Sequence, residues 1–146
     1  MTVEEMFAAM RWTPEERADF RARFPRLYRD VEHDSTWALD GASVGRGWRA
    51  LLERVFTIAE GEPKVQVGQV KEKWASLRVY LEHIQERSEL ARVVAEVEAE
   101  SQRTCEACGN IGDLACVFPN LVKTVCIEHL PDGASYLPSP PDDLVV

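Results

Sequence analysis

The sequence predicts an α+β fold with N-terminal helices, a β-hairpin, a long helix and a small C-terminal segment that contains paired cysteines. The main observation is a change of period. Apolar residues recur at helical spacing in two separate segments, and between these segments they alternate with a period of two. A chain of 146 residues has the usual size of one domain, in which roughly 70% of the unfolded surface becomes buried. We therefore expect a single α+β domain over residues 1–130 and an irregular Pro-rich tail over residues 131–146.

The first clear helix is predicted to begin after Thr13. Thr13 is a typical N-cap, Pro14 suits the first helical position, and Glu16 completes a capping box with Thr13. Pro25 should break or restart this helix, because proline lacks an N–H group and clashes with the preceding turn. The helical segment should end near Asp30.

A connecting loop is expected over residues 31–45, where polar residues and glycines surround Trp37. We expect Trp37 to hold this loop against the core. A second helix should follow from Gly47, because apolar residues in the range 48–56 occur at i, i+3, i+4, i+7 and i+8. Gly61 should end it.

A β-hairpin is predicted within residues 64–82, where apolar and polar side chains alternate. The turn should lie near residues 74–76. Helical spacing returns at Leu90, and this long helix should extend to about Gln102. It would deliver the chain directly to Cys105.

Two ligand pairs form the strongest chemical signal in the sequence. Cys105 and Cys108 are the first pair, Cys126 and His129 are the second, and together they give the pattern C-x2-C-x17-C-x2-H. Pairs with this spacing each cover one edge of a tetrahedral zinc site, and four protein ligands close it to substrate. We therefore predict one structural Zn²⁺ in a treble-clef or ribbon-like knuckle over residues 103–130. The alternative is that the cysteines are small buried hydrophobes.

The other residues capable of chemistry do not form a recognisable set. Cys116 lies outside both pairs in an apolar run, so we expect a buried strand thiol, and the alternative is a further metal ligand. His33 and His83 are isolated. The sequence contains no G-x-S-x-G, no phosphate loop ending in Gly-Lys-Ser/Thr and no H-E-x-x-H. We therefore favour a protein without catalytic residues, and an enzyme with an unrecognised site is a third hypothesis.

The charge of the chain limits its partners. A formal net charge of −8 and a pI near 4.9 argue against nucleic acid and anionic membranes, which attract basic surfaces. No apolar run approaches the length of a membrane span, and residues 1–10 do not resemble a secretory signal. We therefore expect a cytoplasmic protein, in which cysteines serve as metal ligands more often than as disulfides.

The predicted hairpin concentrates charged and aromatic residues. Lys71, Lys73, Trp74, Arg78 and Tyr80 lie on it, and Trp, Tyr and Arg dominate protein interfaces. A period of two should place Arg78 and Tyr80 opposite the apolar residues of their strand. We predict that these five residues contact a protein partner. The alternative is a solvated strand face with cross-strand charge pairs.

Three motifs resemble those of a group of uncharacterised small zinc-knuckle proteins of bacteria and their phages. They are a G-x-G-W element at residues 45–48, a Q-V-K-E-K-x-x-x-L-R-x-Y element at residues 69–80, and the C-x-x-C-G and C-x-x-H pairs. The resemblance spans roughly residues 24–129. In that group the hairpin has glycine and phenylalanine where this chain has Ala75 and Val79. The resemblance implies the same order of elements, the same zinc ligands and, by analogy with phages, an accessory, inhibitory or immunity role.

These observations together favour a non-enzymatic, zinc-stabilised protein-binding module. Its expected role is that of an acidic inhibitor or immunity protein acting on a toxin or defence factor. The alternative is a zinc-containing nucleic-acid-binding regulator. The support for this alternative is the arginine-rich first helix, with Arg17, Arg21, Arg23, Arg26 and Arg29.

Overall fold

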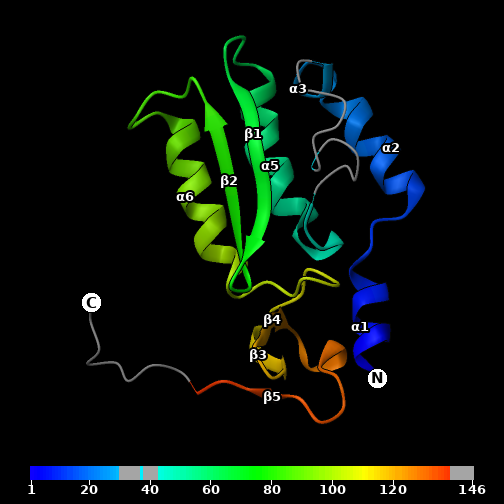
Figure 1. Ribbon diagram of the computed structural model, residues 1–146. Coiled ribbons are helices and arrows are strands. Elements are labelled where there is room, and N and C mark those ends of the chain that lie inside the picture. The colour runs from blue at the N-terminus through cyan, green and yellow to red at the C-terminus, as the bar shows by residue number, and fades with distance from the viewer. Residues whose placement is uncertain (30–36, 38–42, 139–146) are drawn as a thin grey trace.

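The chain folds into a mixed α+β structure with two small antiparallel sheets, which confirms the fold class that the sequence predicts (Figure 1). The computed structural model describes residues 1–29, 37 and 43–138. A two-stranded sheet lies beside two helices, and a three-stranded sheet lies below it in Figure 1, next to the first helix. In chain order the elements are α1 (Val3–Met10), α2 (Pro14–Arg23), α3 (Pro25–Arg29), η1 (Arg46–Trp48), α5 (Arg49–Glu60), β1 (Gln66–Lys73), β2 (Ser76–Glu82), α6 (Glu89–Ser101), β3 (Asp113–Phe118), β4 (Leu121–Val125), η2 (Ile127–His129) and β5 (Ser135–Tyr136).

Helix α1 is an element that the sequence analysis missed. The side chain of Thr2 caps it by accepting a hydrogen bond of 3.1 Å from the backbone N–H of Glu5. A Thr followed three residues later by a Glu is the spacing of a capping box, so the signal was present in the sequence. Met6 and Met10 are buried against the cysteine-containing region of the fold. Helix α1 therefore belongs to the metal region rather than to the helices that follow it.

The predicted capping box at the start of α2 is confirmed. The hydroxyl of Thr13 accepts from the N–H of Glu16 at 3.1 Å, and the Glu16 carboxylate accepts from the N–H of Thr13 at 2.9 Å. Pro25 restarts the chain as α3, as expected. Most of the loop predicted for residues 31–45 lies outside the described residues. Trp37 is described, and its burial in the core confirms its predicted role.

Helix α5 and the hairpin build the main core. The predicted apolar face of α5 is confirmed, since it buries Leu52, Val55 and Phe56 against the aromatic residues of α2 and α3. The β1–β2 turn falls at Trp74 and Ala75, whose φ angles are 51° and 62°. Two consecutive residues with positive φ form the turn type that suits the twist of a two-residue hairpin. The hairpin therefore turns where the sequence predicted.

Side chains of α6 accept hydrogen bonds from backbone N–H groups on the edge of β2 that does not pair with β1. The N–H of Leu77 donates to the hydroxyl of Ser101 at 2.8 Å, and the N–H of Val79 donates to the carboxylate of Glu98 at 3.0 Å. Exposed strand edges invite pairing with other chains, and these two bonds close this edge. The helix predicted to follow the hairpin therefore also supplies hydrogen-bond partners to the hairpin's outer edge.

The three-stranded sheet has the order β4-β3-β5. Its third strand, Ser135–Tyr136, corrects the expectation that the tail has no regular structure. The free edge of β3 accepts this segment, and the Tyr136 hydroxyl donates to the carbonyl of Val125 at 3.1 Å. Cys116 lies on β3 as expected but is only half-buried, which corrects its predicted burial. In the described part of the chain, every helix is too short or too polar to cross a lipid bilayer.

Candidate metal centre

The four predicted ligands come together between the end of α6 and the three-stranded sheet. Cys105 and Cys108 lie in the turn that follows α6, whereas Cys126 and His129 flank the short helix η2 after β4. Their four candidate ligand atoms all lie within 4.8 Å of one another. Residues from two distant segments of the chain can therefore bind one metal ion.

The distances within this group match a tetrahedral arrangement. The Sγ atoms of Cys108 and Cys126 are 3.7 Å apart. The Nδ1 atom of His129 lies 3.3 Å from the Sγ atom of Cys126 and 3.9 Å from that of Cys105. Around a tetrahedral zinc ion with ordinary Zn–S and Zn–N bonds, neighbouring ligand atoms are roughly 3.6–3.8 Å apart. Both the spacing and the thiolate–imidazole donor set are consistent with zinc.

The first ligand pair sits in a tight turn that the backbone closes by itself. The N–H of Gly109 donates to the carbonyl of Cys105 at 3.0 Å, and the N–H of Cys105 donates to the carbonyl of Asn110 at 2.8 Å. Gly109 has a φ of 81°, a conformation that glycine adopts without a steric cost. The N–H of Ala107 also points at the Sγ atom of Cys105, 3.4 Å away. Such a contact would orient the sulfur as a metal ligand.

The G-x-G-W element forms the seat on which this turn rests. A Cβ atom on Gly47 would overlap the carbonyl oxygen of Cys105, and one on Gly45 would overlap that of Glu106. The N–H of Gly47 instead donates to the carbonyl of Glu106 at 3.0 Å. The indole N–H of Trp48 donates to the carbonyl of Thr104 at 2.8 Å. The start of α5 is therefore joined directly to the metal-binding turn.

Glu106 joins the two halves of the centre, although the sequence analysis gave it no role. Its side chain is almost fully buried and accepts from the backbone N–H of Thr124 at 2.7 Å, while its own N–H donates to the carbonyl of Thr124 at 2.9 Å. Burial raises the pKa of Glu106 to about 7, and the nearby ammonium of Lys123 opposes this rise. Glu106 and Thr124 thus lock the first ligand pair to the strand that leads to the second.

The thiols differ in their readiness to ionise. Burial raises the pKa of Cys108 to about 12. Burial also opposes ionisation of Cys126, but its hydrogen bonds with His129 and Cys108 outweigh this effect and lower its pKa to about 7. Of these two thiols, Cys126 is therefore the one that ionises more readily. A bound cation would favour the thiolate form at each cysteine.

The five predicted partner-binding residues lie on the hairpin, apart from the metal ligands. Trp74 and Tyr80 expose 76% and 45% of their surface, and Lys73 is also exposed. Lys71 lies over the Tyr80 ring, 5.6 Å from its centroid, and Arg78 forms a long ion pair of 3.9 Å with Glu98 of α6. The apolar residues that alternate with Arg78 and Tyr80 face the core. The hairpin therefore has the two-faced character that its sequence predicts.

Comparison of the chain with protein-family models, curated proteins and solved structures finds no match.

Proposed function

We propose that the protein is a non-enzymatic protein-binding module stabilised by one structural zinc ion. Cys105, Cys108, Cys126 and His129 would hold the ion. The support for a structural role is that four protein ligands lie within 4.8 Å of one another, and four such ligands on one zinc ion leave no coordination position for water or substrate. When bound, zinc supplies a cross-link between the two ligand-bearing segments. A first ligand pair, the β3–β4 hairpin and a second ligand pair follow one another in the chain, which supports a treble-clef or ribbon-like knuckle.

The docking surface in this proposal is the hairpin face, defined by Lys71, Lys73, Trp74, Arg78 and Tyr80. The observation that carries the proposal is that Trp74 at the turn and Tyr80 and Lys73 on the strands are exposed, beside the half-buried Lys71 and Arg78, in a protein whose net charge is −8. Exposed Trp and Tyr near Arg are typical of interface hot spots. The local positive charge would attract an acidic partner and orient it.

The metal centre supports this face through the hairpin turn. The Thr124 hydroxyl donates to the carbonyl of Ala75 at 2.8 Å, and the Lys123 ammonium lies 3.2 Å from the Glu72 carboxylate. Glu72 in turn accepts from the N–H of Ala75 at 2.9 Å. Each contact attaches the turn that presents Trp74 to strand β4, which ends next to the ligand Cys126. Zinc would therefore stabilise the position of the docking surface as well as the knuckle.

Two of the five arginines that supported a nucleic-acid-binding alternative, Arg23 and Arg26, are engaged within the protein. Arg26 donates to the backbone carbonyls of Ala59, Glu60 and Val65. Arg23 forms an ion pair of 2.8 Å with Glu53. Guanidinium groups used in this way cannot contact phosphates without losing bonds that hold the fold together. A protein partner therefore fits the structure better than nucleic acid. Whether the module acts as an inhibitor or as an immunity protein depends on the identity of that partner.

Metal analysis tests the first half of the proposal. Purified protein should contain one equivalent of zinc, and Cys108→Ser should lose it because three ligands bind far more weakly than four. Cys116→Ser is the matched control, since that thiol lies outside the ligand group, and it should retain the metal. A zinc content near zero in the wild-type protein would refute this half.

Variants of the hairpin face test the second half. Proteins retained by the wild-type chain from its native cell extract should be identified, purified and measured individually by calorimetry. Trp74→Ser should weaken the genuine partner by about 2 kcal/mol or more, as at other aromatic hot spots. Phe118→Ser removes a comparably exposed aromatic ring outside the hairpin face and should leave the affinity unchanged. Equal losses in both variants, or none in either, would place the docking surface elsewhere.

A further inference from the structure

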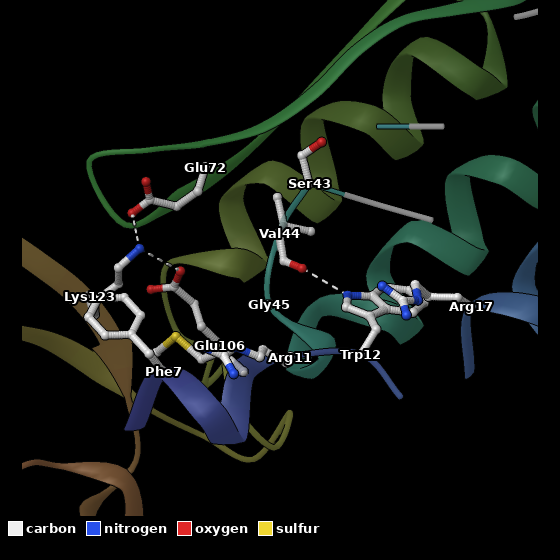
Figure 2. Close-up of a pocket in the computed structure, with 11 residues that line it drawn as sticks. Phe7, Arg11, Trp12, Arg17, Ser43, Val44, Gly45, Glu72, Glu106 and Lys123 are labelled. Carbon is white, nitrogen blue, oxygen red and sulfur yellow. Dashed lines mark hydrogen bonds and ion pairs between the residues drawn. The ribbon is translucent and has the colours of Figure 1, made fainter. Parts of the chain in front are cut away.

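A groove of about 760 Å³ lies between helix α1, the start of α2, the segment before α5 and the metal region. Figure 2 shows paired charges at one end, where Lys123 lies between Glu72 and Glu106, and Trp12 with Arg17 at the other. Apolar side chains also line the groove, among them Phe7, whose ring centroid lies 5.9 Å from the ammonium of Lys123. The groove lies apart from the hairpin face, because none of its lining residues belongs to that face.

The charges at the two ends of the groove differ in how they are used. The ammonium of Lys123 lies 3.2 Å from the carboxylate of Glu72 and 3.6 Å from that of Glu106, so this group is internally paired. Arg11 and Arg17 also line the groove. Within the described ranges, no ion pair or hydrogen bond involves either of these two guanidinium groups. The groove therefore carries two cations, Arg11 and Arg17, that no carboxylate of the described residues pairs with.

Acidic residues outnumber basic ones by 25 to 17 in this chain, so most arginines would be expected to find a carboxylate. Arg11 and Arg17 have none among the described residues. Neighbouring arginines do find carboxylates: Arg46 binds Glu16 at 2.9 Å, and Arg49 binds Glu53 at 2.9 Å. The groove also contains the buried hydroxyl of Ser43, which has no hydrogen-bond partner in the described part of the chain. Two guanidinium groups beside an apolar wall are complementary to a carboxylate next to an apolar side chain.

We propose that this groove binds an extended acidic segment of a protein, with carboxylates on Arg11 and Arg17 and apolar side chains against Phe7, Trp12 and Val44. Charge complementarity favours an acidic occupant. The two arginines would repel a basic segment, and a purely apolar segment would desolvate them without supplying a negative charge. The groove has a volume of about 760 Å³, which lies in the range of clefts that bind ligands in proteins. This inference is independent of the hairpin face.

The test uses the zinc-loaded full chain and a capped hexapeptide of alternating Glu and Leu, with binding followed by NMR chemical shifts. The peptide should produce saturable shifts at the Trp12 indole N–H and at Val44. A matched peptide of alternating Gln and Leu should bind roughly tenfold more weakly, because two exposed ion pairs are lost. The variant R11Q/R17Q should weaken the acidic peptide by a similar factor.

Three controls make the result specific. R87Q/R103Q removes the same charge from exposed arginines outside the groove and should not change the affinity. R11K/R17K retains the charge and should keep most of the binding, which separates a charge effect from misfolding. Trp74→Ser should bind the peptide normally, so failure of the hairpin-face proposal would not affect this one.

Three results would overturn the proposal. They are no saturable shifts at millimolar peptide, equal binding by R11Q/R17Q and the wild type, or equally tight binding of inorganic phosphate. The last result would define a small-anion site instead of a peptide site.

Discussion

The two halves of this protein keep their structure by different means. The helix–hairpin core, formed by α2, α3, α5, α6 and the β1–β2 sheet, contains all of the buried Trp and Phe side chains among the described residues. The metal region, formed by α1 and strands β3 to β5, buries mainly small residues and Met, and two of its buried members are the ligands Cys105 and Cys126. Burial of a large apolar side chain stabilises by about 1.5–3 kcal/mol, so the first half has an ample apolar core and the second does not.

This difference shows what the metal ion would do. A region with few large apolar groups cannot offset its conformational entropy by burial alone, and a metal cross-link supplies the missing stability. The contact between the halves is nevertheless intimate, because Trp48 belongs to the main core and also hydrogen-bonds to the chain just before Cys105. The stability of the two halves should therefore depend on metal to different degrees. A change in one half should still affect the stability of the other through the contacts at the start of α5.

The largest expected effect comes from breaking the metal site. Cys108→Ser, or removal of the ion by a chelator, should unfold residues 103–130, since structural zinc contributes on the order of 10 kcal/mol in small zinc domains. Amide hydrogen exchange should show lost protection in β3 and β4 but retained protection in the middle of α5. Simultaneous loss of protection in both halves would show that the core is not independent of the metal.

A smaller effect is expected from disturbing the seat between the halves. Gly47→Ala would force a Cβ atom into the carbonyl of Cys105, and overpacking of this kind costs about 1–3 kcal/mol. Denaturant unfolding should show this loss together with weaker zinc retention. Gly61→Ala is the matched control, because its Cβ would lie 3.6 Å from the nearest carbonyl. If the two variants unfold alike, the close approach at Gly47 has no energetic importance.

The smallest effect should follow from removing one hydrogen bond across the seat. Trp48→Phe keeps an aromatic ring in the core but leaves the carbonyl of Thr104 without its indole donor, and loss of one such hydrogen bond should cost about 0.5–1.5 kcal/mol. Thermal unfolding measures the loss. Trp74→Phe makes the same substitution at an exposed position and should change stability by less than about 0.5 kcal/mol. A stability change as small at position 48 would mean that the indole bond does not couple the halves.

Local patterns in the sequence were sufficient for most elements. The capping box of Thr13 and Glu16, the apolar face of α5 and the alternation in the hairpin each depend on residues a few positions apart, and each formed as predicted. The spacing of the four ligands likewise predicted their assembly. Helix α1 was missed although Thr2 and Glu5 carry the same capping signal, because the eight residues of the helix give too short a period to recognise.

The roles of Gly47, Glu106 and Thr124 could be assigned only from the tertiary structure. The sequence identified Gly47 as the beginning of a helix, Glu106 as one residue between two ligands, and the hairpin turn as an independent element. In the fold, Gly47 supports the metal-binding turn, and Glu106 and Thr124 connect that turn to Ala75. Such contacts join positions that are far apart in the chain, such as Trp48 and Thr104, which are separated by 56 residues. The sequence by itself determined where most of the helices, the β1–β2 hairpin and the four ligands lie, because these depend on short-range periodicity and spacing. Only packing of the completed elements decided which backbone carbonyls, glycines and buried carboxylates meet, because that choice depends on shapes that no single segment contains.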